Sequence, residues 1–280
     1  MMKTLLVPVD FSEDSMAAVK QALELANAVG LSIRLIHVKK KKTYYFGFST
    51  SNEEQFPDDE IKAHLQSVVN NFKPGYTAGG TFDFIIRHGS ITHEIIAESE
   101  AVEVYAILTG LQGNTSLRDY LVGSNAYRIV AAAQKPVFAV RKSMPVKPVR
   151  RILLPIEDKQ DTRIKVPVVA ALAKELDAEI LVLGITDSPY EEMIAKVQIY
   201  VRQTLDYFKE RNLKCSSKEL ISVEVPQKIV EVAKEENVDL IAFVSDMTDD
   251  ILGQMLSVSV KYILHQSECP LLCVPVNILD

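Results

Sequence analysis

The chain has 280 residues, of which 48% are hydrophobic and 24% charged, and its formal net charge at pH 7 is −6. This length is compatible with one large α/β domain or with two domains, and the composition can fill ordinary hydrophobic cores. No apolar run reaches the length of a transmembrane helix, and no signal-peptide pattern is present. We therefore expect a soluble, cytoplasmic protein that does not contact a membrane.

Charge divides unevenly along the chain. Residues 1–149 carry 16 basic and 15 acidic side chains, whereas residues 150–280 carry 15 and 22. Neither half is basic enough to suggest a nucleic-acid surface, and the acidic second half is a poor host for phosphates. The three cysteines are too few for a disulfide framework, so we interpret Cys269 and Cys273, which lie in an apolar run, as core residues.

The first half alternates strand-like and helix-like segments. A β-rich run ends in Asp10, and a helical pattern follows from Ser12, the candidate N-cap, to Gly30. Residues 32–38 form a second strand, so the chain opens as a βαβ unit, which implies a parallel sheet. Residues 39–57 lack a regular period and form a long connection. The later elements are predicted as helices near 58–72, 92–100 and 119–134 and as strands at 82–88, 104–109 and 136–140.

The pattern then repeats. Residues 152–157 mirror 5–10 at an offset of 147, and residues 269–274 mirror 135–140 at an offset of 134, so the second copy is 13 residues shorter. The repeat predicts a first domain over residues 1–141, a polar linker over 142–149 and a second domain over 150–280. In the second copy, Ser188 to Glu191 reads as a capping box with proline at N1, which starts a helix to about Arg211.

A glycine-containing loop at residues 107–124 carries the clearest functional signal. Gly110 and Gly113 can adopt positive φ and let backbone N–H groups approach a ligand. Gly123 and Ser124 open the next helix, whose unpaired N–H groups and dipole favour an anion. A polyphosphate is the natural candidate.

These motifs together resemble the universal stress protein family, and the resemblance covers nearly the whole chain twice. Its residues are Val9-Asp10-Phe11-Ser12, His37-Val38, Gly110-x-x-Gly113 followed after nine residues by Gly123-Ser124, and the Pro136-Val137 strand. The resemblance implies a tandem, often dimeric, stress-response protein that binds an adenine nucleotide. Its implied fold is α/β, with two open five-stranded parallel sheets in the order 3-2-1-4-5 and helices on both faces.

Carried over by position, the family pattern implies a binding site in the first half. Asp10 and the backbone of Val38 would contact adenine, the glycines and Ser124 would contact ribose and phosphates, and Asn114 to Ser116 would donate hydrogen bonds. An open α/β sheet independently favours a ligand at this point, where the strand order reverses. The expected binding set is Pro8, Val9, Asp10, Val38, Thr109, Gly110, Gly113, Asn114, Gly123, Ser124 and Asn125, with no metal ligand assigned.

The second half departs from this pattern. Glu157 stands for Asp10, Lys159 for Ser12, and Ser257-Val258 for Gly123-Ser124. The intervening aspartates Asp246, Asp249 and Asp250 would face a polyphosphate with like charge. We therefore expect one nucleotide per chain, held by the first half alone.

Two function classes remain open, together with a structural alternative. One is a regulatory protein that binds ATP, ADP or AMP, with or without Mg²⁺; the other is an enzyme that slowly hydrolyses ATP or transfers its phosphate. The loop has no Walker-type Lys-Ser/Thr pair, and no second carboxylate is evident beside Asp10, so binding is favoured over catalysis. A nucleotide-independent structural protein is the third reading, and the retained glycines argue against it.

The fifth strands, two histidines and the segment that follows the second strand call for separate interpretations. The fifth strands, Pro136–Val140 and Pro270–Val274, lack the charges that usually protect a sheet edge, so we expect the halves to pair through them. His37 and His88, at strand ends, are expected to be rim or core histidines. Lys39–Lys42 is read as a solvated run, and the role of Tyr44–Phe46 stays undecided between covering the adenine and packing on the other half. The sequence does not choose the physiological nucleotide, the downstream partner or the oligomeric state.

Overall fold

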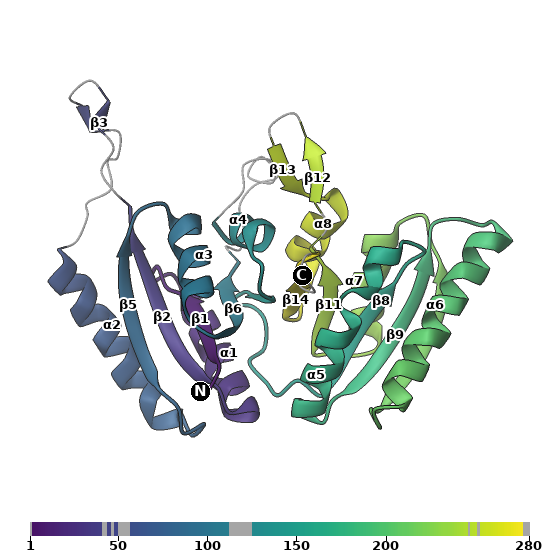
Figure 1. The fold of residues 1–280 in the computed structure, drawn as a ribbon, viewed down its shortest axis with the longest axis horizontal. Helices are drawn as coiled ribbons and strands as arrows, with labels where there is room; N and C mark the ends of the chain where they lie inside the picture. The colour runs from purple at the N-terminus through teal and green to yellow at the C-terminus, as the bar shows by residue number, and fades with distance from the viewer. Residues whose placement is uncertain are drawn as a thin grey trace.

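A single ten-stranded sheet runs through the whole molecule (Figure 1). The computed structural model describes residues 2–40, 44–45, 48–49, 57–111, 125–245, 247–250 and 253–276. In spatial order the strands are β5 (Phe82–His88), β2 (Ser32–Lys39), β1 (Thr4–Pro8), β6 (Val104–Gly110), β7 (Val137–Val140), β14 (Leu271–Val274), β11 (Leu240–Val244), β8 (Arg151–Ile156), β9 (Glu179–Thr186) and β10 (Cys215–Ile221). Within each half this is the expected order of third, second, first, fourth and fifth strand.

The five-stranded sheets of the two halves are joined through their fifth strands into one continuous sheet. Strands β7 and β14 pair antiparallel, with Phe138 opposite Leu272 and Val137 opposite Cys273, whereas the other pairs of this sheet are parallel. The predicted pairing of the two fifth strands is thereby confirmed. Each apolar edge is covered by the other, which removes a surface that would otherwise promote aggregation.

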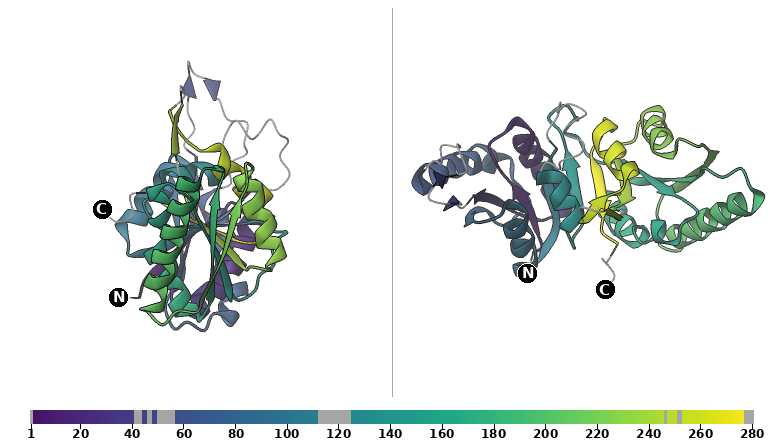
Figure 2. Two further views of the ribbon diagram at one scale, coloured as in Figure 1. Left: turned by 90° about the vertical axis from the view of Figure 1, so that its right-hand side faces the viewer. Right: turned by 90° about the horizontal axis from the view of Figure 1, so that it is seen from above.

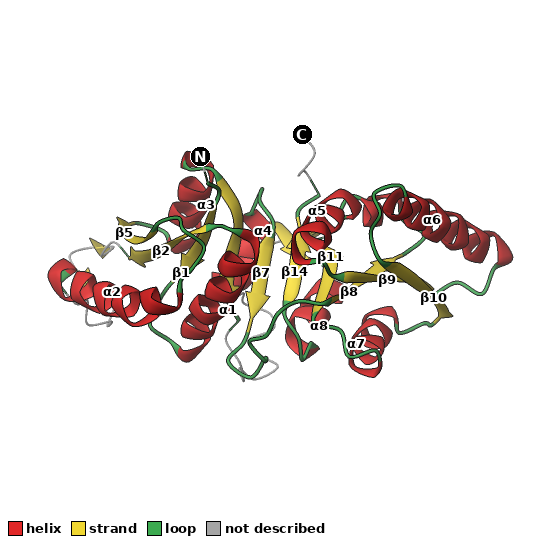
Figure 3. Cartoon of the chain, turned by 90° about the horizontal axis from the view of Figure 1, so that it is seen from below, coloured by secondary structure: helices red, strands yellow, loops and turns green. Residues whose placement is uncertain are grey.

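Helices cover both faces of the sheet (Figure 3). One hydrophobic core lies under α1 (Glu13–Val29), α2 (Asp58–Phe72), α5 (Val166–Leu176) and α6 (Glu191–Lys209). The other lies under α3 (Ile91–Ala101), α4 (Asn125–Ala132), α7 (Val225–Glu235) and α8 (Val258–Gln266). Because side chains alternate along a strand, Leu5 and Val7 enter the first core and Leu6 enters the second. Both cores continue from one half into the other.

Several helix ends follow from local sequence. Ser12 is the N-cap of α1 and accepts a hydrogen bond from Ser15 N at 3.2 Å, and Gly30 ends the helix in the left-handed region with φ 76°, both as predicted. The predicted capping box at Ser188 is wrong. Helix α6 begins only at Glu191 with Tyr190 as N-cap, so Glu191 is its first residue and is not positioned to reach back.

The segment predicted as a polar linker, residues 142–149, is fastened at both ends. Lys142 N donates to Asp14 Oδ1 at 2.8 Å, and the amides of Arg150 and Arg151 both donate to Asp239 Oδ2 at 2.9 Å. Met144 within it is buried in the first core. The two halves are therefore held in one arrangement by the connection as well as by the sheet.

Two short hairpins project from the same side of the molecule (Figures 1 and 2). One pairs β3 (Tyr44–Tyr45) with β4 (Phe48–Ser49), inside the connection that had no regular pattern, and the other pairs β12 (Met247–Asp250) with β13 (Gly253–Leu256). Short 3₁₀ turns, η1 (Lys73–Gly75) and η2 (Gln160–Arg163), complete the described elements. Among the described residues, none of the helices combines the length and the apolar character needed to cross a bilayer.

Candidate functional site

A pocket opens at the carboxyl ends of β1, β2 and β6, where α1, α3 and α4 converge. The chain leaves β1 toward β2 on one side and β6 lies on the other, so this is the reversal point of the strand order. The pocket is lined by Pro8, Val9, Asp10, Ser12, Asp14, Ser15, Ile36, His37, Val38, Ile91, Ile95, Thr109, Gly110, Asn125, Ala126 and Ile129.

Every described member of the expected binding set lines this pocket. These residues are Pro8, Val9, Asp10, Val38, Thr109, Gly110 and Asn125. The other expected residues, Gly113, Asn114, Gly123 and Ser124, lie outside the described residues. Three strand ends and the start of α4 thus bring together residues that are more than 100 positions apart in the chain.

Asp10 is a carboxylate held in place by its own loop. Its Oδ1 accepts hydrogen bonds from Ser12 Oγ at 2.6 Å and from Ser12 N at 3.1 Å. Burial acts to raise the pKa of Asp10, but the hydrogen bonds from Ser12 and Ser15 outweigh it, so the pKa lies below its ordinary value. The group is therefore anionic at neutral pH and can accept a hydrogen bond from a ligand.

Gly110 is a glycine for a different reason from the one predicted. Among the described glycines, only Gly30 and Gly79 have positive φ, so the expected left-handed conformation at Gly110 is wrong. A Cβ at Gly110 would instead lie 2.5 Å from the backbone carbon of Asp14 and 2.8 Å from Ser15 N. The missing side chain lets the end of β6 pack against the start of α1.

The apolar wall of the pocket was missed by the sequence analysis. Ile36 comes from β2, Ile91 and Ile95 from α3, and Ile129 from α4. The i, i+4 spacing of Ile91 and Ile95 marks one face of a helix, but only the fold shows that this face borders the strand ends. The four isoleucines give the pocket a surface suited to a flat apolar ring.

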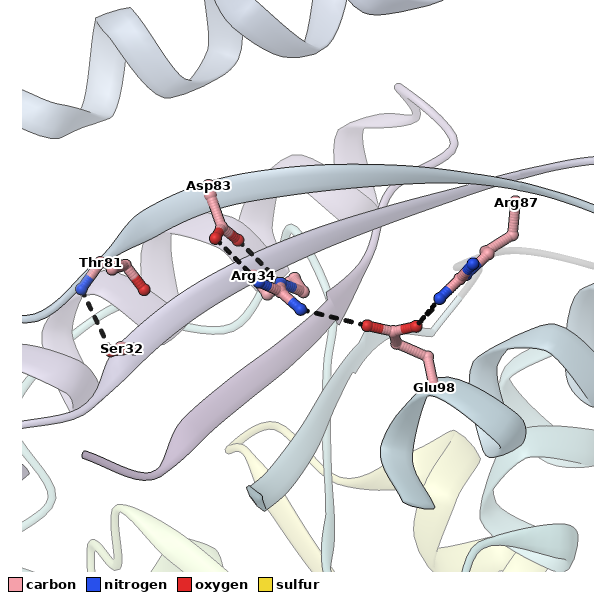
Figure 4. Close-up of polar contacts among 6 residues, drawn as sticks. All are labelled: Ser32, Arg34, Thr81, Asp83, Arg87 and Glu98. Atoms are coloured by element: carbon pink, nitrogen blue, oxygen red, sulfur yellow. Dashed lines mark hydrogen bonds and ion pairs between the residues drawn. The ribbon is translucent and has the colours of Figure 1, made fainter. Parts of the chain in front are cut away.

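Buried Glu98 holds α3 in position against the sheet (Figure 4). The Glu98 side chain is 1% exposed and pairs with Arg34 at 3.3 Å and with Arg87 at 2.5 Å. Arg34 also binds Asp83 through two hydrogen bonds of 2.9 Å, and these contacts raise the pKa of its guanidinium further. The network ties α3 to β2 and β5, and thereby fixes Ile91 and Ile95.

His37 lies at the rim of the same pocket, as expected for a strand-end histidine. Its Nδ1–H donates to the carbonyl oxygen of Val9 at 2.7 Å. The ring of Phe11 stacks on it with 5.2 Å between centroids. Phe11 has φ 65°, an uncommon conformation for a bulky residue, at the turn that also presents Asp10.

A second carboxylate does lie near Asp10, contrary to expectation. Asp14, the second residue of α1, lines the pocket. Its Oδ1 accepts the hydrogen bond from Lys142 N that fastens the connecting segment. Asp14 therefore has an evident structural role.

The corresponding edge of the second half has a different shape. At the offsets of the repeat, Phe243 replaces Thr109 and Val244 replaces Gly110. The helix that follows the first strand also differs: α1 begins at Glu13, whereas α5 begins at Val166 and is preceded by the 3₁₀ turn η2. The described parts of the chain contain no group of three or more His, Cys, Asp or Glu arranged to hold a metal ion.

Comparison with known proteins gives one consistent result. A family model described as "Universal stress protein family" matches residues 1–141 and again residues 148–275. Universal stress protein MJ0577 of Methanocaldococcus jannaschii is 30% identical over 159 residues, which cover 51% of this chain and 96% of the relative. Universal stress protein G of Salmonella typhimurium is 29% identical over 147 residues, which cover 50% of this chain and all of the relative.

A solved structure also matches the chain over its full length. The crystal structure of a universal stress protein from Archaeoglobus fulgidus DSM 4304 superposes with a TM-score of 0.76 over 98% of both chains, at 16% sequence identity. At this identity the likeness concerns the fold. The two curated relatives each match about half of the present chain, whereas this structure matches both halves together.

Proposed function

The chain is a tandem member of the universal stress protein family, and from this premise we propose that its first half binds an adenine nucleotide, with ATP, ADP or AMP as the candidates. The observation that carries the proposal is the single pocket lined by all seven described residues of the expected set. The isoleucines would pack against the base, and Asp10 would accept a hydrogen bond from it. In the sequence, Gly110 and the start of α4 flank the glycine-containing segment that would receive the phosphates.

We further propose that the protein is a regulatory binder with slow or no turnover. In support, the described lining of the pocket includes no lysine or arginine, so this part of the site offers no cationic side chain to stabilise the charge of a transferring phosphoryl group. The bound state would be read by partners in a cytoplasmic stress response.

Nucleotide binding is assigned to the first half alone. In support, Phe243 and Val244 stand in the second pocket where the first has Thr109 and Gly110. A buried lysine, Lys165, also stands at the position of Ala18. The lining of the first pocket is consequently not repeated.

Isothermal titration calorimetry of the full chain with ATP tests the proposal. We expect one nucleotide per chain, and at least about tenfold weaker binding in Asp10→Ala, since a hydrogen bond to a charged group is worth roughly 1.5–3 kcal/mol. Asp206→Ala, an exposed aspartate on α6, is the matched control and should bind like the wild type. Two equivalent sites per chain, or an unchanged affinity in Asp10→Ala, would contradict the proposal.

A further inference from the structure

The second half has its own pocket at the carboxyl ends of β8 and β11, in the place corresponding to the first pocket. Its polar lining comprises Glu157, Lys159, Thr162, Lys165, Ser257 and Ser259, and apolar side chains of β11, α7 and α8 complete it. Of the expected nucleotide contacts in the described part of the first half, Pro8 has an identical counterpart in this lining, Pro155, whereas Glu157, Phe243, Val244 and Ser259 replace Asp10, Thr109, Gly110 and Asn125. The residues present instead define a different chemistry.

Lys165 is the central feature of this pocket. It is 2% exposed, yet within the part of the chain that the structure describes its ammonium group makes no hydrogen bond and no ion pair. Burial lowers the pKa of Lys165 to about 8, against an opposing effect of Glu157, so the amine is still mainly protonated near pH 7. An unpaired buried ammonium is costly, which calls for an anionic partner in the pocket.

Glu157 alone does not provide that partner. It lines the same pocket and acts on Lys165 through space, but the two charged groups do not come within ion-pair distance, 4.0 Å. Burial raises the pKa of Glu157, Lys165 and Lys159 act in the opposite direction, and the negative charges of Asp158 and Asp187 raise it again. Among the described residues that line the pocket, Glu157 is the one carboxylate beside two lysines.

The first turn of α8 adds donors to the same place. Ser257 is its N-cap and accepts a hydrogen bond from Val260 N at 3.3 Å, and Ser257 and Ser259 both line the pocket. The first amides of a helix have no acceptor within the helix, and its dipole favours negative charge there. A cation, a hydroxyl pair and a helix start thus converge on one space.

Two of the aspartates expected to repel an anion, Asp249 and Asp250, lie on strand β12 of the second hairpin. Strand β12 pairs with β13 so that Met247 faces Leu256 at the base of the hairpin and Asp250 faces Gly253 at its tip. The tip lies three residues from the base, or roughly 10 Å along the strand. The hairpin projects away from the body of the sheet (Figure 1), so its tip lies farther from the sheet than its base does.

We propose that the second-half pocket binds a small organic oxyanion, a carboxylate or a phosphate monoester, whose head is held by Lys165, Lys159 and the start of α8. The apolar side chains of β11, α7 and α8 would pack against its body. The site is separate from the proposed nucleotide pocket and does not depend on it. The protein would then carry two sites of different specificity.

Calorimetric titration of the full chain with inorganic phosphate and, separately, with butanoate tests this assignment. We expect saturable binding of at least one probe, at least tenfold weaker in Lys165→Met and several-fold weaker in Lys159→Met. Methionine matches the shape of the lysine stem without its charge, so Lys165→Met should fold. Lys159 is exposed, and its replacement leaves the core unchanged.

Lys174→Met, at an exposed position on α5, is the matched control and should bind both probes like the wild type. Tighter binding of phosphate or of butanoate identifies the preferred head group. Either result supports the site if the Lys165→Met protein no longer binds the preferred probe. The assignment is overturned if the wild type binds neither probe, or if Lys165→Met binds them as well as the wild type does. ATP binding by the same Lys165→Met protein reports on the first half independently.

Discussion

Gly110 and Val244 occupy corresponding positions in the two halves. The helix that follows the first strand begins differently in each half. With no side chain at Gly110, α1 begins at Glu13, directly against the strand end. With valine at 244, the corresponding turn is a 3₁₀ turn and α5 begins later, at Val166. The missing Cβ at Gly110 therefore leaves room for the start of α1.

Gly110→Ala is accordingly expected to lower stability by about 1–3 kcal/mol, because the new Cβ overlaps the backbone of Asp14. It should also weaken nucleotide binding, since the start of α1 must move. Gly30→Ala is the control: it strains a left-handed residue by about 1–2 kcal/mol but meets no neighbouring atom, so affinity should be kept. Urea unfolding and ATP calorimetry on both variants separate the two effects; equal affinities would contradict the role of Gly110.

Lys165 should give the protein a characteristic pH dependence. Its pKa is about 8 in the folded state and 10.5 in the reference state, so between these values the unfolded chain binds more protons. The free energy of unfolding of the wild type should therefore rise with pH through this window relative to Lys165→Met, by on the order of 3 kcal/mol in total. Urea unfolding of both proteins from about pH 7 to about pH 10 measures this change in the free energy of unfolding. If the difference between the two proteins stays constant over this range, Lys165 is not desolvated.

For single residues, the sequence predicts a place in the site where the residue belongs to a recognisable strand-end motif. Asp10, Val38 and Gly110 could be placed together because strand ends of a parallel sheet meet at one edge. The isoleucine wall and the contact of Gly110 with Asp14 could not, since they depend on which helix face packs beside which strand. Lys165 could not be singled out either, because burial of a lone lysine leaves no local pattern.

Helix α3 depends on a buried carboxylate, and this is testable at the level of the element. Glu98→Gln keeps the size of the side chain but leaves Arg34 and Arg87 without their shared anion. We expect a loss of about 1–3 kcal/mol in the free energy of unfolding. Faster amide exchange across residues 91–101, measured by mass spectrometry, should accompany it. Glu100→Gln, an exposed neighbour, should change neither quantity.

The junction of the two fifth strands has a polar fastening of its own. The guanidinium of Arg141, just after β7, donates to the carbonyl oxygens of Leu264 and of Ser267, the latter at 3.1 Å, at the end of α8. Arg141→Met should cost about 1–3 kcal/mol, because carbonyls at a helix end lose a cationic donor. Arg202→Met, on the exposed side of α6, should stay within about 0.5 kcal/mol. Chemical unfolding of both variants decides whether this contact stabilises the junction.

Most elements could be predicted from the sequence because their signals are local. The strand Phe82–His88 and the helix Asp58–Phe72 have the predicted bounds, and the caps at Ser12 and Gly30 were identified. The hairpins were not predicted, since neither segment alternates regularly. The capping box at Ser188 failed because the residue pattern fits several helix starts equally well.

For the whole molecule, the sheet junction predicts how a half would behave alone. A chain ending at residue 141 would leave β7 without its partner β14, as an apolar edge of unpaired N–H and C=O groups. We expect this fragment to self-associate as its concentration rises. Size-exclusion chromatography with light scattering measures its mass, and a fragment that stays monomeric throughout would show that the edge is not adhesive.

The order of strands within each half could be predicted because the family resemblance carries it. The continuous ten-stranded sheet could be anticipated only through the bare fifth-strand edges, since nothing else in the sequence distinguishes neighbouring sheets from a joined one. The burial of Met144 in the connecting segment could not be predicted either, because the residues that surround it are distant in the chain.

The antiparallel contact of β7 with β14 also bears on how such a protein can change. In a symmetric pair of identical chains, every substitution is present on both sides of the axis and must be tolerated twice. Here Val-Phe-Ala-Val meets Leu-Leu-Cys-Val, two different sequences on one polypeptide, so a change on either side occurs once. Corresponding positions of the two halves can therefore differ, as alanine at 18 and lysine at 165 do.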